Sequence, residues 1–394
     1  MRFKTRTLAW LSPKVHRAVA LAVSAAVRAA PKLNHIAVHG WPAHEGNVVE
    51  TVREFVRLSD RQVIWLDGPS ASEITAMGIH NEGSQVRSVR KNSCKGIWAY
   101  CTAEVVFFTH GLYNSPRPSL RKPTVNLWHG DGPKVNVGSV VRSTYFVSGS
   151  TAFCAYRASY FEVPPERWLL TGLPRTAKLY SGTGAATLKT LGIDPAAPFV
   201  VWLPTYRATH GAGPDGSWSD TKGVDTDTSV NSAAAEMTAA LFAEGIQVVV
   251  KPHPLDVNSR SISGAIALAD ADLAANGTTL YELMGASSGL VTDYSSAWTD
   301  YLALDRPIGF LIPDESAYTE GRGLSVMHGI ADLPGPVLRT PRDYRLFAQD
   351  VRGSEDASTS SLRAEAVRRF GLTFSPNPAS DLFVALNRLC VLNL

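Results

Sequence analysis

Short apolar segments alternate with longer segments of helical period along most of the chain. Residues His35 to His39 are apolar enough for a buried strand, and the run from Val48 to Leu58 then repeats its apolar residues at helical spacing. A second apolar strand, from Arg61 to Leu66, follows that helix. Strand, helix and strand in turn are typical of right-handed crossovers, so the pattern predicts a parallel sheet.

The same alternation continues in both halves of the chain. The first half adds expected strands at Val105–Thr109 and Thr124–Trp128. In the second half we expect strands at Phe199–Leu203, Ile246–Val250, Gly289–Thr292 and Ile308–Leu311, with helices at Ser232–Ala243 and Ser296–Leu304. We therefore predict an α/β fold of two parallel-sheet domains. Ligands bind at the carboxyl edge of such sheets, and two facing domains would place both edges across a central cleft.

Composition shifts divide the chain into five predicted parts. A stretch rich in Gly, Ala, Thr and Pro suggests a linker at 181–198, between domains at 34–180 and 199–372. A basic segment is expected at 1–33 and a C-terminal helix at 373–394.

The composition is that of a globular protein, with 45% hydrophobic and 19% charged residues among 394. The net charge is +3 and no expected domain concentrates its basic residues, so nucleic-acid binding is not predicted. The four cysteines are scattered, which predicts neither a disulfide framework nor a zinc site. We expect no metal, no cofactor and a reducing compartment.

The first 33 residues carry seven basic side chains, and no acidic residue precedes Glu45. Between these charges lies the weakly apolar stretch Ala18 to Val27, which is too short to span a membrane. We predict a basic helix lying on anionic lipid. A solvated helix packed on the protein is the main alternative. A signal peptide is the least favoured, because Arg28 stands where a cleavage region should be uncharged.

Unusual polar residues follow the predicted strands. His129 comes directly after a strand and before a glycine-rich turn that contains Gly130 and Asp131. An imidazole there can accept a proton from a hydroxyl near neutral pH, although a histidine bonded inside its turn is an equal alternative. Lys134, four residues on from Gly130, is either a phosphate ligand or a solvated lysine.

Three further clusters lie in the second half. Arg207 follows the strand that ends at Pro204, and its guanidinium suits phosphate or a surface ion pair. Lys251 and His253 alternate with prolines that end a strand abruptly, a rigid arrangement that suits an anionic ligand. A fourth cluster combines Asp293, Ser295 and Ser296 at a strand-to-helix junction. Either serine can be the N-cap, and the helix start can attract an anion.

In this order the clusters resemble the CDP-glycerol glycerophosphotransferase family, the primases and polymerases of teichoic acids. The matching segments are Trp128-His129-Gly130, Gly172-Leu173-Pro174-Arg175, Pro204-Thr205-Tyr206-Arg207, Lys251-Pro252-His253 and Thr292-Asp293-Tyr294-Ser295-Ser296. The helix start Gly46-Asn47 and the pair Asp300-Tyr301 are also similar.

The resemblance implies a GT-B fold, with two Rossmann-like domains and the site between them. It implies transfer of glycerol phosphate from CDP-glycerol, or ribitol phosphate from CDP-ribitol, to a lipid-linked teichoic acid precursor, with CMP leaving. The place of action would be the cytoplasmic face of the membrane, with the protein bound peripherally.

The resemblance also implies residue roles. His129 would be the general base, and His253 would act beside it while holding the pyrophosphate with other donor-binding residues, namely Arg207, Lys251, Asp293, Ser295 and Ser296. Gly130, Asp131, Lys134 and Arg175 are further candidates. Charge neutralisation dominates phosphoryl transfer, and these groups can supply it without a metal.

This chain departs from the family pattern at three places. Asp131 stands where the family usually has threonine, and it would raise the pKa of His129 or repel the donor phosphate. Lys251 replaces an arginine, and Thr176-Ala177 replaces Asn-Asp. Asp131 and Thr176-Ala177 leave open a non-catalytic membrane-associated relative. A GT-B glycosyltransferase that uses a sugar nucleotide is a second alternative, because it would share the fold.

Overall fold

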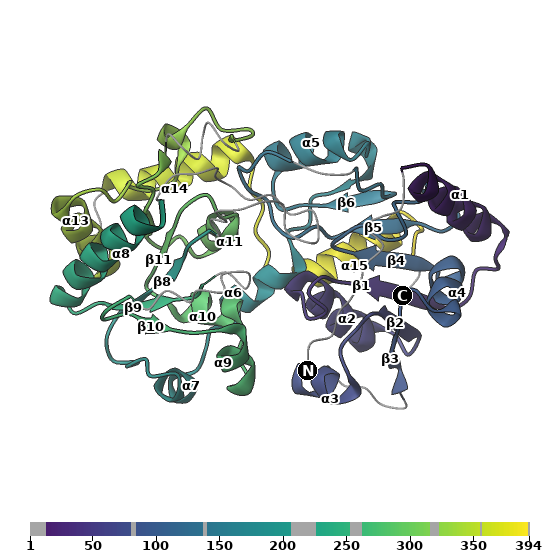
Figure 1. Ribbon diagram of the computed structural model, residues 1–394, viewed down its shortest axis with the longest axis horizontal. Helices are drawn as coiled ribbons and strands as arrows, with labels where there is room; N and C mark the ends of the chain where they lie inside the picture. The colour runs from purple at the N-terminus through teal and green to yellow at the C-terminus, as the bar shows by residue number, and fades with distance from the viewer. Residues whose placement is uncertain are drawn as a thin grey trace.

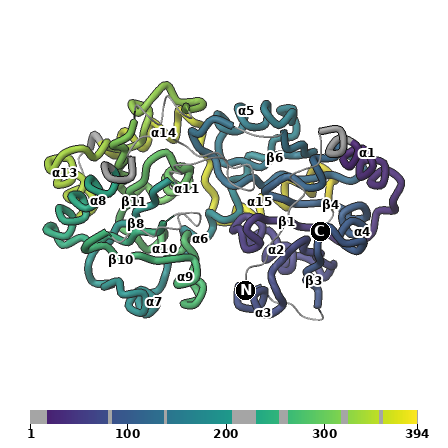
Figure 2. The backbone as a smooth tube through the Cα atoms, viewed as in Figure 1, coloured from purple at the N-terminus to yellow at the C-terminus, as the bar shows by residue number. Residues whose placement is uncertain are grey.

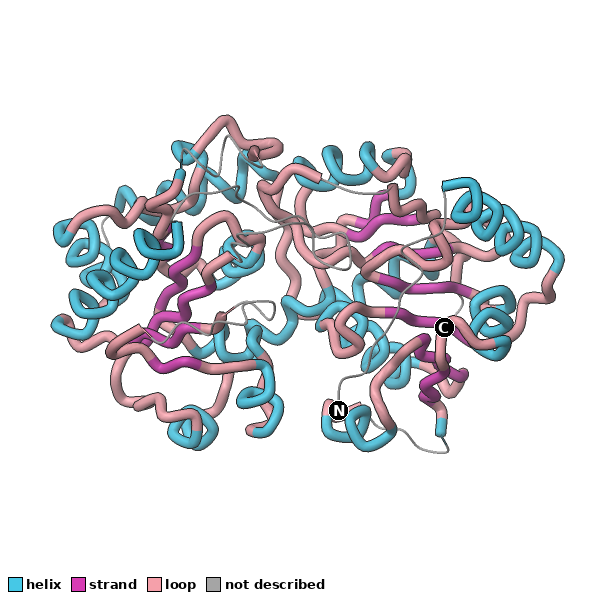
Figure 3. The backbone as a smooth tube through the Cα atoms, viewed as in Figure 1, coloured by secondary structure: helices cyan, strands magenta, loops and turns pink. Residues whose placement is uncertain are grey.

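The computed structural model describes residues 13–79, 84–136, 140–205, 226–252, 262–315, 323–354 and 357–392. Two parallel sheets, each flanked by helices, lie side by side along the long axis of the molecule (Figures 1 and 3). The predicted α/β fold with two parallel sheets is confirmed.

The first sheet has seven strands in the order β3-β2-β1-β4-β5-β6-β7, all paired in parallel. They are β1 (His35–His39), β2 (Gln62–Leu66), β3 (Val86–Val89), β4 (Val105–Phe108), β5 (Thr124–Asn126), β6 (Tyr145–Val147) and β7 (Trp168–Leu169). Strands β4 and β5 are neighbours, with Phe108 opposite Asn126, so the loops that follow them meet at the carboxyl edge of this sheet. We call this edge the first edge.

The second sheet has five parallel strands in the order β10-β9-β8-β11-β12. They are β8 (Phe199–Leu203), β9 (Gln247–Val250), β10 (Ile266–Ala267), β11 (Gly289–Thr292) and β12 (Ile308–Phe310). Its carboxyl edge, the second edge, carries Lys251 after β9 and Asp293 after β11.

Helices cover both sheets. They are α1 (Pro13–Ala29), α2 (Gly46–Leu58), α3 (Ala71–Ala76), α4 (Cys94–Thr102), α5 (Thr151–Tyr160), α6 (Ala177–Ser181), α7 (Ala185–Thr190), α8 (Thr226–Ala243), α9 (Asp270–Ala275), α10 (Leu280–Ala286), α11 (Ala297–Tyr301), α13 (Pro341–Val351), α14 (Ala357–Phe370) and α15 (Pro378–Arg388). Helix α2 begins where the Glu45 carboxylate accepts hydrogen bonds from two backbone amides, and it buries Val48, Val52 and Phe55 against the first sheet.

The chain returns to its first half at the end (Figure 2). Helix α14 contributes Phe370 to the core of the second sheet, whereas α15 contributes Leu382, Phe383 and Leu386 to the core of the first. Residues 181–198, expected to be a linker, contain α7 and pack Leu188, Leu191 and Ile193 into the second core. The five-part division of the chain stays a prediction.

Helix α1 packs one face against α4, where Val23 and Val27 join a core cluster with Tyr100 and Cys101. Its other face is exposed at Leu21. In the described ranges no helix is both long enough and apolar enough to cross a membrane.

Candidate functional site

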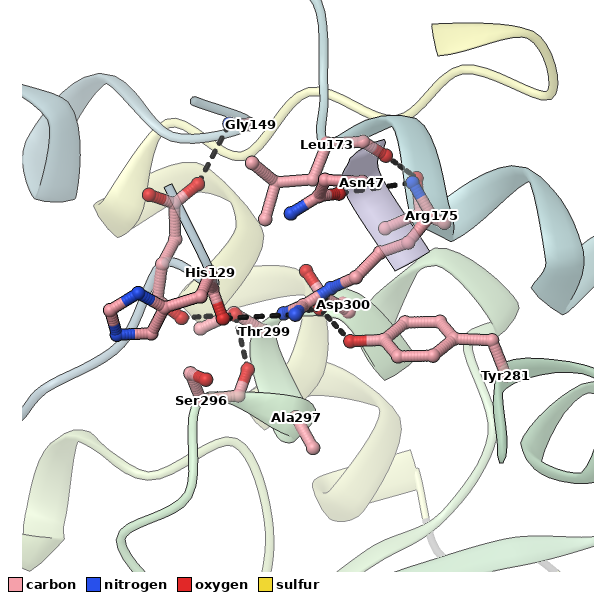
Figure 4. A network of polar contacts seen from close by, with 12 residues as sticks. Asn47, His129, Gly149, Leu173, Arg175, Tyr281, Ser296, Ala297, Thr299 and Asp300 are labelled. Carbon is pink, nitrogen blue, oxygen red and sulfur yellow. Dashed lines mark hydrogen bonds and ion pairs between the residues drawn. The ribbon is translucent and has the colours of Figure 1, made fainter. Parts of the chain in front are cut away.

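The loop after β5 lies between the two sheets and touches the start of α11 (Figure 4). We call residues 127–136 the histidine loop. Gly130 has a φ of +137°, and a Cβ atom there would lie 2.5 Å from Ser296 Oγ. A Cβ atom on Gly132 would lie 2.6 Å from the Ser296 Cβ. Two glycines are therefore required where the loop of the first edge meets the second edge.

Asparagines fix the backbone of the histidine loop. Asn126 Oδ1 accepts from the Trp128 amide at 2.9 Å, and Asn47 Nδ2 donates to the Trp128 carbonyl at 3.1 Å. Trp128 itself has a φ of +54°, a left-handed conformation that such contacts must hold. Arg157 adds a contact from α5, because its guanidinium lies 5.4 Å from the Trp128 ring and donates to the Gly132 carbonyl at 2.9 Å.

The imidazole of His129 is exposed, yet protein surrounds it on several sides. It stacks on His110, with ring centroids 4.8 Å apart and planes 9° apart, and it touches the Trp128 ring at 4.0 Å. Desolvation by these neighbours, and then the charges of His110, Arg157 and Arg175, hold the pKa of His129 well below its usual value. His129 is therefore neutral near pH 7, as a general base requires.

Arg175 links the two edges. It follows Gly172-Leu173-Pro174 in the 3-10 turn Pro174–Thr176, and its Nη1 donates to the His129 carbonyl at 2.9 Å. Its Nη2 donates to Asp300 Oδ2 of α11 at 2.8 Å. The same Asp300 oxygen accepts from the Tyr281 hydroxyl at 2.5 Å. Arg175 thus holds protein groups in place, and Figure 4 shows it between the histidine loop and α11.

The start of α2 completes this network. The Arg175 amide donates to Asn47 Oδ1 at 3.1 Å, and its Nη1 lies 3.6 Å from Glu45 Oε1. Burial raises the pKa of Glu45 to about 7, against the lowering effect of Arg175. Glu45 therefore titrates near neutral pH, inside the network that positions His129.

Asp131 is bound by two neighbours from the segment before α5. Its carboxylate accepts from the Ser148 hydroxyl at 2.9 Å and from the Gly149 amide at 2.7 Å. Burial raises the pKa of Asp131 to about 6. Burial, His110, Arg157 and Arg175 lower the pKa of His129, and the expected effect of Asp131 on that histidine stays a prediction. Asp131 shapes the loop, and its carbonyl accepts from Thr299 Oγ1 at 2.6 Å.

Lys134 lies at the far end of the histidine loop. Its backbone pairs with Leu324 in an isolated antiparallel bridge, and its Nζ lies 3.4 Å from Thr205 Oγ1. The amide of Ser325 donates to the Pro133 carbonyl at 2.5 Å. Lys134 is therefore placed beside Thr205, two residues before Arg207 in the chain.

Asp293 orients the second edge. Its Oδ2 accepts from the Thr205 amide at 2.8 Å, and its other oxygen accepts from the Thr205 hydroxyl and, at 3.2 Å, from the Ser295 amide. The side chain is 3% exposed. Asp293 ties the segment after β8 to the start of α11, and its expected role as a donor-binding residue stays a prediction.

Ser295 and Ser296 stand before α11, with Ser296 against Gly130 and Gly132. Ser295 Oγ, rather than that of Ser296, accepts from the Ala297 amide at 3.3 Å. Ser296 is thus brought to the histidine loop, whereas Ser295 serves the helix start.

Lys251 is buried, and its Nζ pairs with Asp270 Oδ1 at 2.9 Å at the start of α9. It is already paired with a carboxylate, which a phosphate would have to replace. Arg207 and His253 lie outside the described residues. Their expected roles stay predictions.

Four residues of this region had no role in the sequence reasoning. Asn47 and Asp300 belong to segments that only the family resemblance singled out, and Tyr281 carried no signal. His110 follows β4, so the rule that polar residues gather at the carboxyl edge could have found it.

Comparison with known proteins agrees with this geometry. A family model described as CDP-Glycerol:Poly(glycerophosphate) glycerophosphotransferase matches residues 57–371. A teichoic acid ribitol-phosphate primase of Bacillus spizizenii is 25% identical in an alignment of 283 positions, which covers 64% of this chain and 66% of that protein. The chain thus matches slightly less than two thirds of the primase.

Solved structures share the fold. A structure of the wall teichoic acid polymerase TagF superposes with a TM-score of 0.65 at 20% identity, over 92% of this chain and 90% of that one. A TagF variant soaked with CDPG gives 0.65 at 18% identity, over 95% and 94%. A co-structure of S. aureus MnaA with UDP gives 0.53 at 8% identity, over 92% and 98%.

Proposed function

Because the chain belongs to the CDP-glycerol:poly(glycerophosphate) glycerophosphotransferase family, we propose that it transfers an alcohol phosphate from a CDP-activated donor to a teichoic acid precursor. The observation that carries this proposal is the contact of the histidine loop, at Gly130 and Gly132, with Ser296. The expected base of the first edge lies beside the expected donor-binding turn of the second edge. A hydroxyl acceptor and a diphosphate donor would meet at this contact.

The proposed reaction needs one base and several groups that neutralise phosphate charge. His129 takes the proton from the acceptor hydroxyl, whose oxygen forms a bond to the donor's β-phosphorus. The bond from that phosphorus to the CMP oxygen breaks, and CMP leaves. The low pKa of His129 keeps the base neutral before the reaction. Arg207, His253, Ser295 and Ser296 are the proposed donor ligands, and the positive groups among them offset the charge of the pyrophosphate.

Glycerol phosphate is the proposed group transferred, with ribitol phosphate as the alternative. The family description names CDP-glycerol, whereas the curated relative described above is a ribitol-phosphate primase. The acceptor proposed is a lipid-linked precursor of the polymer.

We further propose that a surface of the first half binds the cytoplasmic face of an anionic membrane. The segment 115–122 lies on α1, because the Arg117 amide donates to Ser24 Oγ at 3.0 Å. On α1, α4 and this segment, Trp98 is 55% and Leu120 66% exposed. Exposed basic residues accompany them, namely Arg28, Lys32, Lys95, Arg117 and Arg121. Apolar side chains among basic ones are typical of interfacial binding.

The membrane proposal is tested by sedimentation with vesicles that contain or lack anionic lipid. We expect the wild type to bind anionic vesicles and Trp98→Ser/Leu120→Ser to bind several-fold less. Phe242→Ser on α8, where Phe242 is 70% exposed, is the matched control and should bind as wild type. Equal binding of all three proteins would contradict the assigned surface.

The activity is tested by CMP release from CDP-glycerol and from CDP-ribitol, each with and without a lipid-linked acceptor. We expect CMP from one donor only when acceptor is present, and loss of release in His129→Ala. Release of UDP or GDP from a sugar nucleotide would instead support a glycosyltransferase. No release from any donor by folded protein would support a non-catalytic relative.

A further inference from the structure

A second histidine lies against the proposed base. His110 comes two residues after β4 and His129 three residues after β5, on neighbouring strands of the first sheet. Their rings are nearly parallel, with centroids 4.8 Å apart. Trp41, after β1, packs edge-on against His110 at 5.6 Å. Three adjacent strand ends thus build one aromatic row that ends at His129.

The segment that carries His110 is itself fixed. The Thr109 amide donates to the His39 carbonyl at 3.2 Å, and Thr109 Oγ1 lies 3.1 Å from His110 Nδ1. The His129 ring bonds to the backbone of Thr109. His110 and His129 are therefore joined both by their rings and through Thr109.

The stacking geometry limits what His110 can do. Ring nitrogens donate and accept hydrogen bonds in the plane of the imidazole, whereas the two rings face each other. A direct proton relay between them is therefore excluded in this arrangement. What remains is orientation of the His129 plane and electrostatic repulsion between two protonated rings.

We propose that His110 is a positioning residue for His129: it fixes the plane of the base and, when protonated, disfavours a charge on that base. This inference rests on the proposed function of His129. The two rings are too close to carry a charge each, so one proton on His110 leaves His129 free to act as base.

The charged surroundings of His129 disfavour a proton on its ring. Positive groups near His129 are Arg157 from α5 and Arg175 from the turn before α6. Acidic groups nearby are already bound: Asp300 and Glu45 pair with Arg175, and Asp131 with Ser148 and Gly149. The two arginines disfavour a charge on His129, in agreement with its lowered pKa.

Three variants separate the two roles. His110→Phe keeps an aromatic plane without charge, His110→Gln keeps a polar group beside Thr109 without a ring, and His110→Ala removes both. We expect the Ala and Gln variants to lose kcat by roughly 10- to 100-fold on the alkaline plateau, because a misplaced base is costly. The Phe variant should stay within a few-fold of wild type, and donor KM should be unchanged throughout.

The pH profile of kcat tests the electrostatic effect of His110 on His129. The acid limb of kcat should move to higher pH by about one unit in both His110→Phe and His110→Gln, because removing a nearby positive charge makes His129 easier to protonate. His328→Phe, on a side chain that is 85% exposed, is the matched control and should leave the profile unchanged. Plateau activities and limbs equal to wild type in all His110 variants would overturn the proposal, as would a rise in acceptor KM alone.

A measurement without turnover separates this inference from the proposed function. NMR titration of the histidine Cε1 protons, assigned with His129→Gln, follows His129 in the donor-free protein. As the pH is lowered, we expect the His129 signal of the wild type to shift at a lower pH than the His110 signal. In His110→Phe the midpoint of His129 should lie at a higher pH than in the wild type. An unchanged His129 midpoint would overturn the pairing even in an active enzyme. A shifted midpoint in a protein that releases no CMP would support the pairing of His110 with His129 and contradict the proposed function. Circular dichroism checks that each variant folds.

Discussion

The two sheet edges that meet at this site use their polar residues in opposite ways. At the first edge His129 is exposed, and buried neighbours such as Asn47 and Asn126 hold its loop. At the second edge two of the expected ligands, Asp293 and Lys251, are themselves buried. Asp293 is bonded to Thr205 and Ser295, and Lys251 to Asp270.

This difference separates residues that act on a ligand from residues that shape a site. A motif residue that is already paired with protein groups must give up those partners before it can bind phosphate. We therefore expect donor contacts to come from Ser296 and from the chain segments that follow Thr205 and Pro252. Those segments carry Arg207 and His253.

Replacement of His129, the exposed residue of the first edge, is the strongest test of the difference between the two edges. His129→Gln should lower kcat by roughly 10²- to 10⁴-fold, the usual contribution of a general base. Donor affinity, measured by calorimetry with CDP-glycerol, should change less than threefold, because His129 is not a proposed donor ligand. A large loss of donor affinity at unchanged kcat would assign His129 to binding instead.

The sequence predicted the sheets and the loop of His129, because strands with apolar runs and glycine-rich turns are local signals. It did not predict the Arg175–Asp300 pair, whose members are 125 residues apart in the chain. It assigned Asp131 to the chemistry because sequence shows a carboxylate beside a histidine but not the direction of its side chain. In the structure Ser148 and Gly149 bind that carboxylate.

The Arg175–Asp300 pair joins the two edges, so breaking it tests whether they depend on each other. Both side chains are largely buried, and removing one partner of such a pair costs about 3–5 kcal/mol. Arg175→Met and Asp300→Asn should each lower stability by an amount of this order, and kcat should fall because Arg175 also holds the His129 carbonyl.

A double-mutant cycle in urea unfolding measures the coupling. We expect the double variant to lose clearly less than the sum of the single losses. Additive losses would mean that the two residues act separately and that the ion pair does not join the edges.

Glu45 gives the first edge a dependence of stability on pH. Its pKa is about 7 in the folded protein, above the ordinary value of 4.5. The folded state therefore holds this proton more tightly, so Glu45 favours folding below about pH 4.5, and that contribution is lost as pH rises to about 7. Asp131, with a pKa of about 6, adds to the same trend.

Glu45→Gln should remove part of that slope. We expect wild type to lose about 1–3 kcal/mol more stability than the variant between pH 5 and pH 8, from the size of one pKa unit. Urea unfolding at both pH values measures this, and Glu315→Gln, on an exposed pair with Arg339, is a control. Parallel slopes in wild type and Glu45→Gln would contradict the assignment.

Substitution of Lys251 should have the smallest effect on donor KM, and it tests whether a buried residue of the second edge can also bind the donor. Its Nζ lies 2.9 Å from Asp270, whose side chain is 48% exposed, so the pair is worth little to stability. If Lys251 only pairs with Asp270 and does not bind the donor, Lys251→Met raises donor KM less than threefold. Asp270→Asn then also changes donor KM little. If Lys251 leaves Asp270 for the donor phosphate, Lys251→Met raises donor KM tenfold or more. Asp270→Asn then lowers it, because the lysine no longer has to abandon a carboxylate. The buried partners of the second edge favour the first result, and the opposite result would make Lys251 a ligand that exchanges one anion for another.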